Sequence, residues 1–237
     1  MTQEVLIWDS SAGHALLWWR AGERQARLVK RYEKRCFLTQ FPLFLEQIAD
    51  TLTVGPDTTV YLGAGPGSFT GLKTGIAVLG GFLYARGVTT VRLVSSLDIS
   101  SLRVPLIEGA LHVVARPFND NTLFLSAFEW RAGRRHSVIT ERAVPGGELA
   151  AILTSHAVRS AVLIADADLP PVIEEHFSRL FPDLRRACPD GDIDFDLLPT
   201  LPLRSTADLR SDPLLLEYMA TPADLQGEHT AYYVSMN

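Results

Sequence analysis

The sequence predicts an α/β protein of two lobes, in which mixed sheets are flanked by helices. The first observation is that short apolar runs of strand character alternate with longer segments whose apolar residues recur at helical spacing. The second is a glycine-rich turn at residues 63–67, which joins such a strand directly to such a helix. The third is a change of character near Pro105. It divides the chain into an N-terminal lobe, residues 1–105, and a smaller lobe, residues 106–237, whose C-terminal segment can return to the first.

The N-terminal lobe is predicted to open with three antiparallel strands, followed by a helix and then by a strand–helix unit. The strands are expected at residues 5–8, 14–19 and 23–30, where apolar or alternating runs are bounded by turn residues. The helix is expected at residues 39–50, because four apolar residues fall on one face there: Phe41, Phe44, Leu45 and Ile48. This order of elements is typical of a ribonuclease-H-like, actin-like lobe.

The strand–helix unit, residues 58–87, is the most specific stretch of the chain. A short apolar strand at residues 60–62 leads into Gly63-Ala64-Gly65-Pro66-Gly67, where glycine lets the backbone turn tightly. Ser68 is placed to cap a helix that runs to about Arg86, with Gly87 as its C-terminal cap. The helix is predicted by apolar residues at helical spacing, namely Leu72, Ile76, Leu79 and Leu83.

Four glycines lie inside this predicted helix, at positions 71, 75, 80 and 81. Each lowers helix propensity by about 1 kcal/mol relative to alanine, so about 4 kcal/mol must be offset elsewhere. Gly67, Gly71 and Gly75 are four residues apart and form a ridge without side chains, onto which another segment can pack closely. The ridge predicts either an internal helix packed tightly on its own sheet or a contact between subunits.

The glycine turn can also be interpreted as a phosphate-binding loop, because it directs free N–H groups at an anion. It misses the P-loop signature, since Leu72 separates Gly71 from Lys73-Thr74. The spacing of Gly65, Gly67 and Gly71 also differs from the dinucleotide-binding fingerprint.

Asp9, Ser10 and Ser11 lie between the first two strands, where nucleotide-binding members of the actin-like superfamily contact phosphate or metal. This resemblance makes them candidates for contacting phosphate or nucleotide. Their alternative role is turn chemistry, because aspartate and serine side chains bond their own backbone. A functional Asp9 would need a second carboxylate. Asp98 is one candidate, although Ser95-Ser96 before it can start a helix as a cap.

The second lobe is predicted to contain further alternating strands and helices. Strands are expected at residues 110–115, 123–128, 138–142 and 161–165, and helices at residues 148–155 and 171–180. The proline-rich tail is expected to be mostly connection around one or two helices. The sequence shows no internal repeat and no low-complexity segment.

Composition predicts a globular protein without a membrane span, and the spacing of its Cys, His and Ser residues predicts neither a metal site nor a catalytic residue. The chain of 237 residues is 47% hydrophobic, and its apolar runs are too short to cross a bilayer. It does not start like a signal peptide, so a cytoplasmic location is expected. Cys36 and Cys188 lack C-x-x-C spacing, and no two of the six histidines are four apart.

The net charge of −5 is unevenly distributed. Residues 1–108 hold 11 Lys/Arg and 9 Asp/Glu, whereas residues 109–237 hold 11 and 18. A basic stripe between Arg20 and Arg35 has seven Lys/Arg against Glu23 and Glu33. This stripe predicts either a solvated strand and turn surface or a contact with an acidic partner or RNA phosphates.

Residues 63–75, G-A-G-P-G-S-F-T-G-L-K-T-G, resemble the hallmark of the bacterial TsaB (YeaZ) family, G-x-G-P-G-S-F-T-G-[LV]-R-x-G, with lysine at Lys73. TsaB proteins are accessory proteins of tRNA threonylcarbamoyladenosine synthesis. Asp9-Ser10-Ser11 also resembles their D-T-S. The rest of the chain fits loosely, with Arg116 and Tyr218 as isolated matches in the second lobe and tail. The resemblance implies a divergent member with an actin-like (ASKHA), two-lobed fold.

This resemblance implies a non-catalytic subunit that pairs with a TsaD-type catalytic protein. A TsaE-type ATPase is a further expected partner, a homodimer is expected for the chain alone, and tRNA is expected to be reached indirectly. No cofactor of its own is implied, because ATP and metal are expected on the TsaD-type partner. The expected interface residues are Gly67, Ser68, Phe69, Thr70, Gly71, Lys73, Thr74, Gly75, Val78 and Phe82.

Two alternatives remain open at this point. One is an actin-fold ATPase or phosphotransferase that uses Asp9 and the loop from Gly65 to Gly71, with Ser10 and Ser11 also near the nucleotide. The other is a diverged homodimer outside the tRNA pathway.

Overall fold

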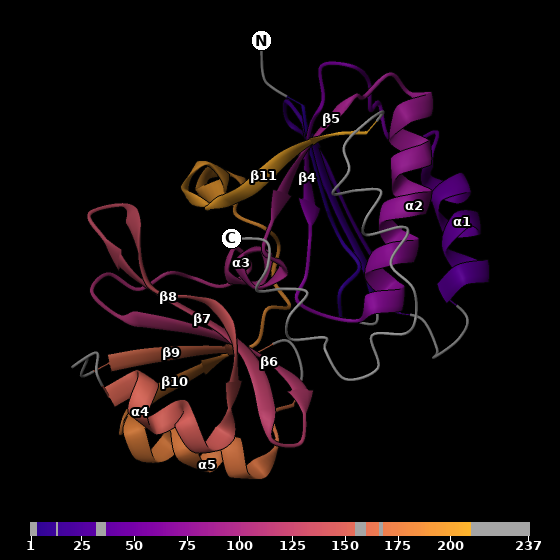
Figure 1. Cartoon of the computed structure of the whole chain (residues 1–237). Helices are drawn as coiled ribbons and strands as arrows, with labels where there is room; N and C mark the ends of the chain where they lie inside the picture. Colours follow the sequence, from indigo (N-terminus) through magenta and orange to yellow (C-terminus); the bar gives the residue numbers. More distant parts are fainter. Residues whose placement is uncertain (1–3, 13, 32–36, 155–159, 166–167, 210–237) are drawn as a thin grey trace. The chain divides into compact units, whose positions relative to one another are not determined.

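The computed structural model describes residues 4–12, 14–31, 37–154, 160–165 and 168–209 (Figure 1). These residues form two compact units. The first comprises the described residues up to Ser96 together with 202–209, and the second comprises those from 97 to 201. The division between Ser96 and Leu97 falls nine residues before the expected lobe boundary at residue 105, directly after the last parallel strand of the first sheet.

The first unit is built on a six-stranded mixed sheet with the order β11-β5-β4-β1-β2-β3. The first three strands form the predicted antiparallel meander, and β4 and β5 then add parallel strands on the other side of β1. The strand bounds are β1 Val5–Asp9, β2 His14–Ala21, β3 Arg24–Arg31, β4 Thr59–Gly63, β5 Thr90–Val94 and β11 Leu203–Asp208.

Two helices, α1 (Phe37–Ile48) and α2 (Phe69–Ala85), pack against each other beside this sheet (Figure 1). Phe41 of α1 is fully buried and its ring lies 4.6 Å from that of Trp8 on β1. All four apolar residues that predicted α2 are buried, as the helical periodicity indicated: Leu72, Ile76, Leu79 and Leu83.

The C-terminal strand β11 pairs antiparallel with β5 and so belongs to the first sheet. The sequence predicts connection here because L-R-S-T-A-D has little apolar character. That prediction is wrong for residues 203–208, where pairing with a neighbouring strand supplies the backbone hydrogen bonds. Residues 210–237, including Tyr218, lie outside the described part of the chain.

The second unit contains a five-stranded sheet with the order β10-β9-β6-β7-β8. It repeats the topology of the first sheet: an antiparallel meander, β6-β7-β8, is followed by parallel strands β9 and β10 on the other side of β6. The strand bounds are β6 Leu111–Asn119, β7 Thr122–Arg131, β8 Arg134–Pro145, β9 Ser160–Ala165 and β10 Asp183–Ala187. The chain is therefore a structural duplication that its sequence does not reveal. The predicted α/β class, with two mixed sheets flanked by helices, is confirmed.

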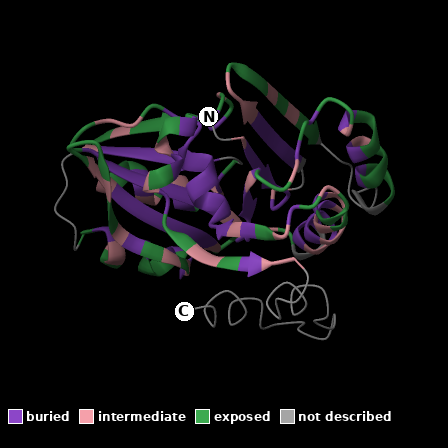
Figure 2. Ribbon diagram, turned by 90° about the horizontal axis from the view of Figure 1, so that it is seen from above, coloured by how far each residue is buried: buried purple, intermediate pink, exposed green. Residues whose placement is uncertain are grey.

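Helices cover both faces of the second sheet. On one face α4 (Leu149–Thr154) and α5 (Pro171–Leu180) lie beside each other and bury a large apolar cluster with the strands (Figure 1). The buried residues, purple in Figure 2, lie largely along the strands of the two sheets. The opposite face is covered by α3 (Ser96–Ser101), whose Leu97 packs with Phe124 and Phe128. Short 3-10 helices occur at Gly146–Glu148 and Phe195–Thr200.

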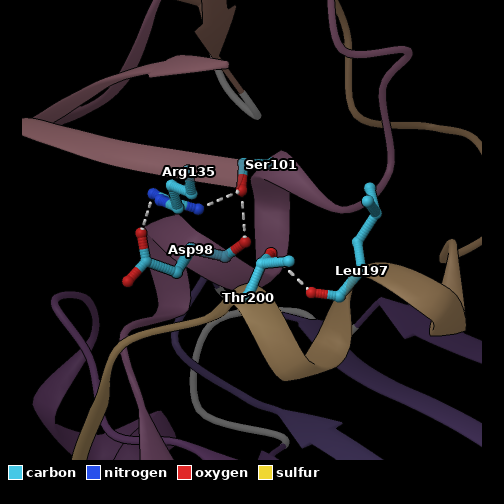
Figure 3. A network of polar contacts seen from close by, with 5 residues as sticks. All are labelled: Asp98, Ser101, Arg135, Leu197 and Thr200. Atoms are coloured by element: carbon cyan, nitrogen blue, oxygen red, sulfur yellow. Dashed lines mark hydrogen bonds and ion pairs between the residues drawn. The ribbon is translucent and has the colours of Figure 1, made fainter. Parts of the chain in front are cut away.

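A buried ion pair links α3 to β8 inside the second unit. The Arg135 guanidinium donates hydrogen bonds to the Asp98 carboxylate and, at 3.0 Å, to Ser101 Oγ (Figure 3). The side chains of Arg135 and Asp98 are only 8% and 7% exposed. Arg135 also lies over the Phe128 ring, with 3.6 Å from Cζ to the ring centroid. The Asp98 carboxylate therefore forms an ion pair with Arg135, and its suggested role as a second carboxylate for Asp9 is not supported.

His112 is a neutral, fully buried part of the same core. Its ring stacks on Phe128 at 5.0 Å, Nε2 accepts from the Ile107 N–H, and Nδ1 lies 3.1 Å from the Ala110 carbonyl oxygen. Burial lowers the pKa of His112 to about 4; the Ala110 hydrogen bond acts in the opposite direction, and the positive charge of Arg135 adds to the lowering.

The low pKa of His112 should make the second unit lose stability in acid. The unfolded chain binds a proton as pH falls through about 6.5, whereas folded His112 does so only near pH 4. The His112 contribution to the unfolding free energy should therefore be complete above pH 6.5 and fall by about 2 kcal/mol by pH 5. Urea unfolding of His112→Asn should lack this part of the pH dependence, while exposed His136→Asn should retain it. Equal pH dependence in wild type and His112→Asn would contradict the assignment.

Candidate functional site

The glycine turn and the start of α2 form as the sequence predicts. Gly65 has φ 91°, a backbone conformation that favours glycine. Ser68 is the N-cap of α2, and its Oγ accepts a hydrogen bond from the Gly71 N–H at 3.2 Å. At the other end Gly87, with φ 79°, follows the C-cap Arg86. The predicted N-cap is therefore confirmed, and the predicted C-terminal glycine lies one residue beyond the C-cap.

The turn after β1 is buried and bonded internally. Asp9 is 1% exposed, and its Oδ1 accepts from the Ser11 N–H at 3.0 Å and from Ser96 Oγ at 2.9 Å. Ser96 Oγ in turn accepts from the Gly65 N–H, and the Ser96 N–H donates to the Gly65 carbonyl oxygen. Asp9 is thus used in turn chemistry, and its further partner is a serine rather than a second carboxylate.

The glycine turn and the turn after β1 bind each other directly. The Ser68 N–H donates to the Ser11 carbonyl oxygen at 2.6 Å, and Ser10 Oγ donates to the Gly71 carbonyl oxygen at 3.0 Å. Both segments had been candidates for binding phosphate. In the structure the two segments are joined to each other by these hydrogen bonds.

The glycine ridge packs on its own chain. A Cβ at Gly71 would lie 2.5 Å from the Ser10 carbonyl oxygen, and a Cβ at Gly67 would lie 2.2 Å from that of Ser11. At Gly75 it would meet Ser10 Oγ at 2.1 Å and Trp8 Nε1 at 3.1 Å. Of the two arrangements that the ridge left open, intrachain packing accounts for these three glycines, because the space beside them is filled by β1 and the turn after it.

The other expected interface residues lie along α2. Phe69 and Thr70 open the helix, Thr74 is buried at 7% exposure, and Lys73 and Val78 are partly buried. Phe82 is partly buried beneath the Arg86 guanidinium, at 4.5 Å from Cζ to the ring centroid. Arg86 also donates to the carbonyl oxygens that follow α1, those of Ala49 and Leu52.

One side of α2 is not covered by the part of the chain that the structure describes, and its residues Gly81 and Tyr84 were not among the expected interface residues. Tyr84 is 57% exposed, and a Cβ at Gly81 would meet nothing within 4 Å. Lys73 is the only charged residue in the 17-residue helix. A helix that is apolar all round is normally buried, so a single charge in 17 residues was the available signal for a contact surface.

The described residues hold no group of three or more His, Cys, Asp or Glu side chains placed to bind a metal ion. Cys188 is exposed and free. Among the described helices, none is long and apolar enough to cross a membrane. The candidate site therefore has two parts. One is the elbow, residues 63–71 bonded to the turn after β1, which positions α2. The other is the exposed side of that helix, with Gly81 and Tyr84.

Comparison with known proteins identifies relatives in structure only. No protein-family model matches the sequence, and no curated protein matches it either. Among solved structures, YeaZ from Pseudomonas aeruginosa aligns with a TM-score of 0.51 and 18% identity, over 70% of this chain and 75% of that one.

A second solved structure is an uncharacterized protein with similarity to peptidase YEAZ from Pseudomonas aeruginosa. It aligns with a TM-score of 0.55 and 18% identity, over 79% of this chain and 83% of the other. Both alignments extend over most of the two chains. The chain accordingly shares the fold of YeaZ.

Proposed function

We propose that this chain is a non-catalytic subunit that pairs with a TsaD-type enzyme and supports transfer of threonylcarbamoyl to adenosine in tRNA. The observation that carries the proposal is the closed elbow. Gly67, Ser68 and Gly71, which match the TsaB motif, are used to bind the turn after β1 and to seat α2. The motif then serves the placement of a helix rather than the binding of a ligand.

The free side of α2 is the proposed docking surface. It presents Tyr84 and Gly81, flanked by the partly buried Val78. Tyrosine is enriched at the centre of protein interfaces, and a glycine without neighbours lets a partner helix approach closely. Gly81 on the exposed side would therefore favour docking. Gly67, Gly71 and Gly75 instead allow the helix to pack against β1 and the turn after it.

Under this proposal the reaction takes place on the TsaD-type protein, in the cytoplasm. That partner would supply ATP and metal, and a TsaE-type ATPase would join the assembly. In the absence of these proteins, the same side of α2 would pair with a second copy of the chain.

The two alternatives differ in what they require of the elbow. An ATPase or phosphotransferase needs Asp9 and the loop from Gly65 to Gly71 to face a nucleotide. Asp9 is buried and bonded to Ser11 and Ser96, and Ser68 and Gly71 of the loop are bonded to the turn after β1. A diverged homodimer would use α2 in the same way as the proposed complex and differs only in its partner.

Replacing Tyr84 with glutamate should weaken binding to a TsaD-type protein of the same organism by about 30-fold or more. The reason is that truncating a central aromatic anchor costs about 2 kcal/mol or more, at 1.4 kcal/mol per tenfold, and a buried unpaired charge adds to this. Dissociation constants from calorimetry and formation of threonylcarbamoyladenosine in the reconstituted system measure the effect. Val172→Glu is the matched control, because Val172 is 60% exposed on α5.

Three results would overturn the proposal. Wild-type chain that fails to bind the TsaD-type protein would remove its basis. Self-association that depends on Tyr84, without any such binding, would favour the diverged homodimer. ATP hydrolysis by the isolated chain that Asp9→Ala abolishes would favour the enzyme.

A further inference from the structure

Strand β3 is an edge strand of the first sheet as the described residues form it. It is the last strand in the order β11-β5-β4-β1-β2-β3 and pairs with β2 alone among the described strands. Its sequence, R-Q-A-R-L-V-K-R, contains four basic residues and no acidic one. This strand holds the centre of the basic stripe, whereas Lys34 and Arg35 lie outside the described residues.

Three of these cations are exposed along the edge. Arg24, Arg27 and Lys30 recur at every third residue, about 10 Å apart at about 3.3 Å per residue. Because the spacing is odd, Arg24 and Lys30 project from one face of the strand and Arg27 from the other. The Arg24 guanidinium lies over the Trp19 ring at 5.3 Å, a cation–π contact that restricts its position.

Charged residues on an edge strand also prevent edge-to-edge pairing with another chain. A single lysine or a short strand is enough for that purpose. Here four cations occupy eight residues in a chain whose net charge is −5. Along the sequence this basic run contrasts with positions 109–237, which hold 18 acidic and 11 basic residues. A local excess of positive charge on an exposed strand attracts polyanions.

The chemistry of the edge fits a phosphate backbone better than an acidic protein. Stable protein interfaces need a buried apolar core, but Val29, at 45% exposure, is the only large apolar side chain on β3 that is exposed. Phosphate contacts need only accessible Arg and Lys side chains, and guanidinium groups bind phosphate in a bidentate manner. No exposed aromatic ring on β3 is available to stack a base.

We propose that the β3 edge binds the sugar-phosphate backbone of RNA through Arg24, Arg27 and Lys30, independently of base sequence. This inference rests on the proposed function for one point, namely that the RNA is a tRNA. The family resemblance implies only an indirect contact between this chain and tRNA, whereas the inference is a direct contact. The edge would hold tRNA near the assembly while the partner performs the chemistry.

Binding of an unmodified tRNA transcript to the full chain tests the proposal by fluorescence anisotropy at a series of salt concentrations. Three phosphate contacts should give a slope of about −2 to −3 for log K against log salt. The triple variant Arg24→Gln/Arg27→Gln/Lys30→Gln should bind at least about tenfold more weakly at low salt and have a slope near zero. Arg24→Lys/Arg27→Lys should retain the slope, because the charges remain.

The matched control is Arg131→Gln/Arg134→Gln/Arg142→Gln on β7 and β8, which removes the same charge from exposed positions. It should change the affinity less than twofold. Equal weakening by both triple variants would reduce the effect to net charge and overturn the proposal, as would absence of wild-type binding. Competition by polyglutamate at equal charge concentration would assign the edge to an acidic protein instead.

The same variants separate this inference from the proposed function. If the β3 variant loses tRNA binding but still binds the TsaD-type protein, both proposals stand. If the β3 variant binds tRNA as tightly as the wild type, or the wild type does not bind tRNA, while pairing through α2 persists, this inference alone is wrong. If pairing fails and the salt-dependent binding on β3 persists, RNA binding stands without the TsaD-type partner.

Discussion

Gly71→Ala should destabilise the first unit by about 3 kcal/mol or more, although alanine is the better helix former by about 1 kcal/mol. The added Cβ would lie 2.5 Å from the Ser10 carbonyl oxygen, a backbone atom that cannot move without displacing the turn after β1. The displacement would also stretch the bonds from Ser10 Oγ to Gly71 and from the Ser68 N–H to Ser11. Thermal and urea unfolding measure the loss.

Gly81→Ala is the matched control in the same helix. A Cβ there meets nothing within 4 Å, so only helix propensity acts and the variant should be more stable by about 0.4–1 kcal/mol. Opposite signs for the two variants would identify intrachain packing as the reason for the glycine ridge. If Gly71→Ala were as stable as Gly81→Ala and instead altered association, the subunit interpretation of the ridge would be restored.

Asp98→Ala should destabilise the second unit by about 3–5 kcal/mol. The substitution leaves the Arg135 guanidinium buried without its carboxylate, and the desolvation cost of that charge is no longer offset. Asp98→Ala/Arg135→Met should recover much of the loss, because replacing both ions with apolar groups removes the unpaired charge. Urea unfolding of the wild type, both single variants and the double variant gives the coupling energy.

The exposed pair Arg179–Glu175 on α5 provides the control for this cycle. Its side chains are 70% and 60% exposed, so Glu175→Ala should change the unfolding free energy by less than about 1 kcal/mol. A loss of similar size at Asp98 and at Glu175 would show that burial does not determine the strength of the Asp98–Arg135 pair.

Local patterns in the sequence were sufficient for most of the elements. Helix α2, its Ser68 cap and its Gly87 terminus follow from apolar spacing and cap chemistry, which depend on residues within a few positions of each other. The edge strands β10 and β11 were not predicted, because D-L-R-R-A and L-R-S-T-A-D lack an apolar pattern. They exist as strands through pairing with β9 and β5, which are distant in sequence.

The candidate site shows the same division between local and distant information. The motif pointed to the correct segment, but its partner across the fold could not be inferred, because Ser10 and Gly71 are 61 residues apart. Likewise, Asp98 was a candidate partner for Asp9, and only the structure pairs it with Arg135 on β8.

The sequence by itself determined the α/β class, the course of the first lobe and the glycine-rich elbow, because each is encoded by residues adjacent along the chain. Only the tertiary structure decided that the second unit repeats the topology of the first, that the glycine ridge faces β1, and that Tyr84 is left exposed. These depend on which faces meet across the fold, and a pattern of apolar residues marks a face as buried without naming what buries it.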